Sequence, residues 1–201
     1  MTALSAGMTR EEAAELLAAH NKDPVHIDHG ETVEQTMRYF AREYDPDNVE
    51  FWGLVGLLHD LDWEEHDDEP ELHTVYAAKD IEAAGGTSEL IRAIQSHTSD
   101  FNTSLPKPEL QMEKILFACD ELTGLIGAAV IMRPSKSVMD FTTKSLKKKF
   151  KDKRFAAGVS REVIASGAEM LGWELDELFA RTIEAMQSFA PDKDTFVPAE
   201  G

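Results

Sequence analysis

The chain has 201 residues, the length of one domain or of one domain with a helical extension. Its composition, 42% hydrophobic and 29% charged, excludes a disordered or fibrous protein. No apolar run approaches the roughly 20 residues of a membrane helix, and the first 20 residues do not resemble a secretory signal. The formal net charge of −18 argues against nonspecific binding to nucleic acids or anionic membranes. We therefore expect a single soluble, cytoplasmic domain over residues 1–201, with no membrane or nucleic-acid partner.

The charge is distributed unevenly along the chain. Nine Lys and Arg residues but only two acids lie between Arg133 and Arg154, a local net charge of +7. The other 11 basic and 36 acidic residues leave −25 on the rest of the chain. The basic segment 133–154 is either a solvated helix face, on which neighbouring lysines repel one another, or a surface that binds anions.

Helical patterns dominate the first third of the chain. Thr9 followed by Glu12 predicts a capping box that opens an Ala- and Leu-rich helix, which ends near residues 20–24. A second helix is expected over residues 29–44. Apolar residues recur there at helical spacing, namely Val33, Met37, Phe40 and Ala41. A short apolar segment, FWGLVGLL, then leads directly into His59 and Asp60.

The later segments continue the helical pattern. Residues 61–72 are acidic and contain Pro70, so we expect a loop there. Further helices are predicted over residues 73–84, 88–97, 109–132, 160–171 and 174–189, with breaks at glycines and prolines between them. No alternating strand pattern is sustained and no internal repeat is present. The fold class is therefore all-α, a compact bundle of several helices.

Polar residues in apolar surroundings indicate a metal site. His59 and Asp60 end an apolar segment, and Asp120 lies within the hydrophobic run ILFACDELTGLIGAAVIM. A buried carboxylate is tolerated only when it is paired, neutralised or bound to a metal. Imidazole and carboxylate without thiolate suit Fe, Mn, Co, Ni or Zn rather than calcium. The single cysteine, Cys119, is read as a buried small hydrophobe rather than a nucleophile.

The order His29, His59-Asp60, Asp120 resembles the H…HD…D signature of the HD-domain superfamily of metal-dependent phosphohydrolases. The flanking segments HGETVEQTMRYFA, GLLHDLDW and FACDELTGLI are similar to those that carry these ligands in the family. The resemblance covers roughly residues 20–130 as the metal-binding core and leaves 131–201 as a C-terminal helical extension. The segment 133–159, RPSKSVMDFTTKSLKKKFKDKRFAAGV, resembles that of a bacterial subgroup of predicted HD hydrolases.

The resemblance implies a reaction and a set of ligands. His73 and His97 are similar in position to ligands of a second metal in dinuclear HD proteins, with Asp60 as the bridge, so one or two divalent ions are expected. The activity implied is hydrolysis of a small phosphorylated metabolite or nucleotide by a metal-activated water. Asp60 and Asp62 are the catalytic candidates, Asp62 as a proton-transfer group or as a support for the ligands.

The sequence departs from the family where many relatives carry a glycine and a phosphate-contacting lysine after the HD pair. This chain reads Asp60-Leu61-Asp62-Trp63 instead. Phosphate binding must then come from other residues, and Arg133 and Lys144 are the candidates for binding substrate.

Two other functions stay open at this stage. A subset of HD proteins resembles di-iron oxygenases with a similar His/Asp set, and a noncatalytic, metal-stabilised binding or regulatory domain is the second alternative. Three further histidines, His20, His26 and His66, are read as surface residues, although His26 competes with His29 as the first ligand.

Overall fold

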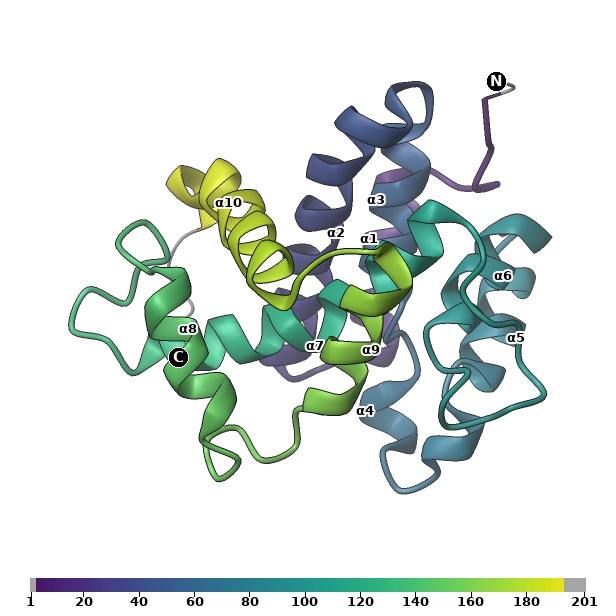
Figure 1. Ribbon diagram of the computed structural model, residues 1–201. Helices are drawn as coiled ribbons and strands as arrows, with labels where there is room; N and C mark the ends of the chain where they lie inside the picture. Colours follow the sequence, from purple (N-terminus) through teal and green to yellow (C-terminus); the bar gives the residue numbers. More distant parts are fainter. Residues whose placement is uncertain (1–2, 194–201) are drawn as a thin grey trace. The chain divides into compact units, whose positions relative to one another are not determined.

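The computed structural model describes residues 3–193 (Figure 1). Every regular element in this range is helical and none is a strand, which confirms the all-α prediction. The chain divides into two compact units, Met1–Leu116 and Phe117–Gly201. The predicted division, a core over residues 20–130 and an extension over 131–201, stays a prediction, as does the single domain. None of the described helices is long and apolar enough to cross a membrane.

The described part of the first unit contains six α-helices, two short 3₁₀ turns and the first residues of α7, which continues into the second unit. They are α1 (Arg10–His20), α2 (Pro24–Tyr44), α3 (Val49–Leu58), α4 (Trp63–His66), α5 (Val75–Ala83), α6 (Ser88–Ser96) and α7 (Gln111–Ile131), with short 3₁₀ turns η1 (Pro46–Asn48) and η2 (Pro70–Leu72). Helix α3 is buried on all sides from Phe51 to Leu58, as expected for a helix without a polar face.

Helices α2 and α3 lie side by side in Figure 1 and approach closely at two glycines. A Cβ atom added at Gly56 would lie 2.8 Å from the carbonyl oxygen of Val33, and one added at Gly30 would lie 2.9 Å from that of Leu57. Any larger residue at either position would push the two helices apart. This close packing fixes the end of α3, where His59 follows.

Side-chain caps explain several helix starts, including those of α1 and α2. The capping box of Thr9 and Glu12 is present at α1, as predicted. Helix α2 begins at Pro24, earlier than the predicted residue 29, because Asp23 caps it by accepting from the backbone N–H of Val25 and Pro24 occupies the first turn. His29 therefore lies inside α2 rather than at its start.

The acidic stretch 61–72 is partly helical rather than a loop throughout. It contains α4 and η2. The carboxylate of Glu64 accepts hydrogen bonds from the backbone N–H groups of Lys22 and Asp23, each at 2.9 Å, and lies 2.9 Å from Nδ1 of His26. These contacts come from the α1–α2 connection, far away in sequence, which is why local composition did not predict the helical turns.

The second unit contains the rest of α7 and three further helices, α8 (Thr143–Lys151), α9 (Arg161–Leu171) and α10 (Leu175–Lys193). The two helices predicted over 160–171 and 174–189 are confirmed, and the second extends further. Cys119 is fully buried, and burial raises the pKa of its thiol to about 12, so its interpretation as a buried hydrophobe is confirmed.

A buried arginine organises the connection between α8 and α9. The guanidinium of Arg161 donates to backbone carbonyls of this segment, including those of Ala156 at 2.6 Å and Val159 at 2.7 Å. It also donates to the carbonyls of Phe150, Asp152 and Phe155. Only 8% of Arg161 is exposed. Sequence patterns did not single out this residue, because its partners are carbonyls that any sequence provides.

We predict that Arg161→Ala destabilises the second unit by about 2–4 kcal/mol, because the carbonyls it binds lose a charged donor. The measurements are thermal unfolding and hydrogen exchange of the amides in residues 150–160. Arg154→Ala is the matched control, since the Arg154 side chain is 96% exposed. Equal rates of amide hydrogen exchange in the two variants would contradict this role for Arg161.

Candidate metal centre

The carboxylate of Asp60 lies at the meeting point of four histidines of the first unit. His59 follows the last residue of α3, and Asp60 comes next. His29 lies on α2, His73 follows η2, and His97 follows the last residue of α6. Four separate segments therefore supply imidazoles to one carboxylate, although these residues are as far as 68 positions apart in the sequence.

The four imidazoles divide between the two carboxylate oxygens of Asp60. Nε2 of His29 and Nε2 of His59 lie 3.6 and 3.4 Å from Oδ2. Nε2 of His73 and Nε2 of His97 lie 3.1 and 3.6 Å from Oδ1. Each oxygen of Asp60 thus has its own pair of imidazole nitrogens.

The other ring nitrogen of three of these histidines is held by a partner. Nδ1 of His59 lies 2.8 Å from the carbonyl oxygen of Gly56, and Nδ1 of His97 lies 2.6 Å from that of Ile94. A carbonyl only accepts, so in both residues Nδ1 carries a proton, which leaves Nε2 as the nitrogen that can bind a metal once its own proton is lost. Loss of that proton gives the tautomer that metal ligation through Nε2 requires.

Asp62 holds His73 in the same way. Its Oδ1 lies 2.7 Å from Nδ1 of His73, and its Oδ2 accepts from the backbone N–H of Ala77 at 2.9 Å. Asp62 is only 1% exposed. Both of its oxygens are engaged, which places Asp62 as a support for His73, and its role in the reaction stays a prediction.

The pKa values reflect this concentration of opposite charges. Burial would raise the pKa of Asp60, but the charge of His59 and hydrogen bonds from His59, His73 and His97 outweigh it and hold the pKa well below its usual range. Burial would lower the pKa of His73, but hydrogen bonds to Asp60 and Asp62 outweigh it and raise the pKa to about 9. Ligation needs a neutral imidazole, so metal uptake at neutral pH has to displace this proton.

The donor atoms are close enough to hold metal ions. His29, His59 and Asp60 form one group, and Asp60, His73 and His97 form another, with the ligand atoms of each group within 4.8 Å of one another. Imidazole nitrogens and carboxylate oxygens without thiolates suit the first-row transition metals and zinc. His59 is fully buried, and the Asp60 side chain is 22% exposed, so the centre is reachable from solvent through Asp60.

The other three histidines have partners outside the centre. His26 lies beside Glu64 and His20 beside Glu65, each pair at 2.9 Å, and the His66 ring stacks on Tyr76 with centroids 4.0 Å apart. Of the two candidates for the first ligand, His29 lies beside Asp60, whereas His26 lies beside Glu64. All three are half-buried rather than fully exposed.

The remaining predicted site residues lie in the second unit. Asp120 is a half-buried residue of α7, and Lys144 is exposed on α8. Arg133 is bound within its own loop, where Nη2 lies 2.6 Å from Oδ2 of Asp140 and the guanidinium covers the Phe141 ring. Their parts in ligation and in substrate binding stay predictions.

The family model of the HD domain matches residues 26–125, which include all the histidines around Asp60. No match was found among curated proteins, and none among solved structures.

We predict that Asp62→Asn lowers the affinity for the ion held by His73 and His97 by about 10- to 100-fold, the usual effect of removing a partner of a metal-bound histidine. One amide oxygen cannot replace the two carboxylate oxygens that bind His73 and Ala77. Competition with a chromophoric chelator measures the affinity. Asp68→Asn, the same change at an exposed position of this acidic stretch, is the control. Unchanged affinity in Asp62→Asn would refute the support role.

Proposed function

The chain belongs to the HD-domain family, and from this premise we propose that it is a metal-dependent phosphohydrolase acting on a small phosphorylated metabolite or nucleotide. The observation that carries the proposal is the position of Asp60. Its two oxygens face two separate pairs of histidines, at 3.1–3.6 Å. A carboxylate shared in this way is suited to bridge two ions, as two-metal hydrolytic sites require.

The donor sets follow from these contacts. His29, His59 and Asp60 would hold one ion, and Asp60, His73 and His97 the other. We include Asp120 in the first set, since it follows the HD pair in the order expected for the family and lies within the matched residues. Bound divalent ions would lower the pKa of a water molecule to near neutrality and offset charge on the phosphoryl oxygens.

The residues of the chain would define the environment of the reaction. Four neutral imidazoles and the carboxylates of Asp60 and Asp120 carry only −2, which is less than the charge of two divalent ions, so the centre would attract an anionic substrate. The Nδ1 contacts of His59, His73 and His97 keep the rings in a fixed orientation before any substrate arrives. Such a fixed arrangement avoids reorganisation during the reaction.

Phosphate contacts have to differ from those of relatives with a lysine after the HD pair. Leu61 is fully buried and Asp62 is bound to His73 and Ala77, so neither replaces that lysine. Arg133 and Lys144 stay the candidates. Lys144 is the more available of the two, because Arg133 is already paired with Asp140.

The direct test of this function is a screen of phosphomonoesters, cyclic nucleotides and nucleotides with protein loaded in turn with Mn, Fe, Co, Ni or Zn. We expect phosphate release with at least one metal, and loss of both metal retention and turnover in Asp60→Ala and Asp120→Ala. Asp68→Ala is the control, because Asp68 is exposed and outside both donor groups. Full metal content and normal turnover in either of the first two variants would refute its assignment as a ligand.

Two outcomes of the same screen would replace the proposed reaction. Iron retained through purification, with a visible absorption band on oxidation and no phosphate release, would favour a di-iron oxygenase. Absence of turnover with every metal, together with a ligand that raises the melting temperature, would favour a noncatalytic binding domain.

We further predict that the wild-type chain binds two equivalents of metal and that His73→Ala and His97→Ala each bind about one. His59→Ala should reduce the binding of both ions, because it removes the buried imidazole beside the shared Asp60. Elemental analysis after removal of free metal gives the stoichiometry. His66→Ala serves as the control, since His66 stacks on Tyr76. One equivalent in the wild-type protein under metal excess, with both variants fully active, would reduce the centre to a mononuclear site.

A further inference from the structure

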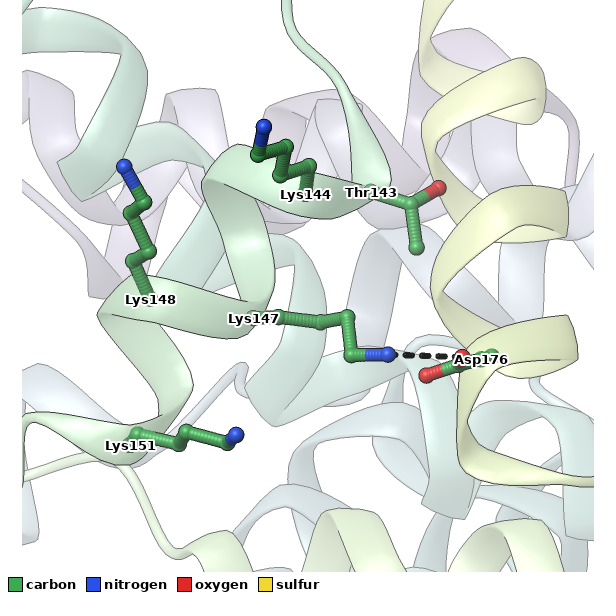
Figure 2. A pocket seen from close by; sticks show the side chains of 6 residues that line it. All are labelled: Thr143, Lys144, Lys147, Lys148, Lys151 and Asp176. Atoms are coloured by element: carbon green, nitrogen blue, oxygen red, sulfur yellow. Dashed lines mark hydrogen bonds and ion pairs between the residues drawn. The ribbon is translucent and has the colours of Figure 1, made fainter.

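Helix α8 in the second unit carries a row of lysines on one side. Lys144, Lys147, Lys148 and Lys151 are spaced i, i+3, i+4 and i+7, which places them on one helix face. They line a pocket of about 430 Å³ together with Thr143 and Asp176, as Figure 2 shows. We call these four residues the lysine face.

The opposite side of α8 is firmly packed. Leu146 is fully buried, and the ring of Phe150 meets that of Phe179 edge-on, with centroids 5.1 Å apart. Thr142 caps the first turn by accepting from the backbone N–H of Ser145, and Arg161 binds the carbonyl of Phe150 at the other end. The lysine face is therefore presented on a fixed helix.

The charges of the lysine face are mostly not offset. Lys147 lies 2.8 Å from a carboxylate oxygen of Asp176 (Figure 2), and this is the only ion pair of the four lysines with side chains of residues 3–190. Lys144, Lys148 and Lys151 are exposed. Like charges at i, i+3 and i, i+4 destabilise a helix by about 0.2–0.5 kcal/mol per pair. A bound anion would remove this repulsion.

The distribution of charge over the chain selects a short anion. The segment 133–154 carries +7, whereas the rest carries −25. A long polyanion such as a nucleic acid would extend beyond the lysines and meet this negative charge, but a compact one would contact only the lysine face. Three exposed ammonium groups favour a ligand with several linked negative charges over a single carboxylate or monophosphate.

We propose that the lysine face is a binding site for a small ligand with two or more linked phosphate groups, such as inorganic tripolyphosphate or a nucleoside triphosphate. The lysine face shares Lys144 with the residues proposed to bind substrate, but the inference does not rest on hydrolysis, because no residue of the metal centre contributes to it. Asp176 lowers the affinity of this site, since its carboxylate competes with the ligand for the ammonium group of Lys147.

The test is isothermal titration calorimetry of the full chain with tripolyphosphate and with ATP, in low salt and with a chelator so that no metal contributes. We expect saturable binding that Lys144→Gln/Lys148→Gln weakens at least tenfold and that rising salt weakens further. Lys153→Gln/Arg154→Gln removes the same charge from the same segment outside the pocket and should change affinity less than threefold. Asp176→Asn should tighten binding, because it removes the competing carboxylate.

Three results would overturn the proposal. They are no saturable binding at millimolar ligand, an equal loss in both double variants, and tighter binding of a single-stranded oligonucleotide or of anionic phosphatidylserine vesicles than of tripolyphosphate. Equal affinity for tripolyphosphate and ATP assigns recognition to the phosphate chain. Tighter binding of ATP also supports the site and adds a contact to the nucleoside.

Discussion

The convergence of four imidazoles on the carboxylate of Asp60 is the constraint on which the first unit depends. A carboxylate beside a fully buried histidine is costly unless charges and hydrogen bonds compensate it. The chain meets this cost by directing Nε2 of His29, His59, His73 and His97 towards the two oxygens of Asp60. Gly56 contributes to this arrangement in two ways. Its missing side chain lets α3 approach α2, and its carbonyl orients His59.

The segments around Asp60 are ordered by contacts that lead back to the centre. Asp62 connects His73 to the first turn of α5 through Ala77. Thr74, between them, has a φ of 65°, an unfavourable conformation for a β-branched residue, and its hydroxyl lies 2.8 Å from that of Thr98 beside His97. The strained backbone at Thr74 therefore lies where His73 and His97 are brought to the same carboxylate oxygen of Asp60.

Local signals in the sequence were sufficient for most of the helices and for the four histidines that the structure brings to Asp60. The Thr9 capping box, the all-apolar α3 and the ordered histidines and aspartates are patterns that short segments carry by themselves. The pairing of Asp62 with His73 was not predictable in this way, because it depends on the path of residues 63–72, which contacts of Glu64 with the α1–α2 connection stabilise. The role of Arg161 was not predictable either, because its partners are backbone carbonyls, which any sequence provides.

X-ray absorption spectroscopy of protein loaded with two equivalents of a single metal tests most directly whether Asp60 bridges two metal ions, as we propose. A bridged pair should give mixed nitrogen and oxygen ligation with no sulfur, and a metal–metal scattering vector at about 3.5–4 Å. This vector should disappear in Asp60→Ala. A spectrum of isolated ions at full loading, with no metal–metal vector, would contradict a bridging Asp60.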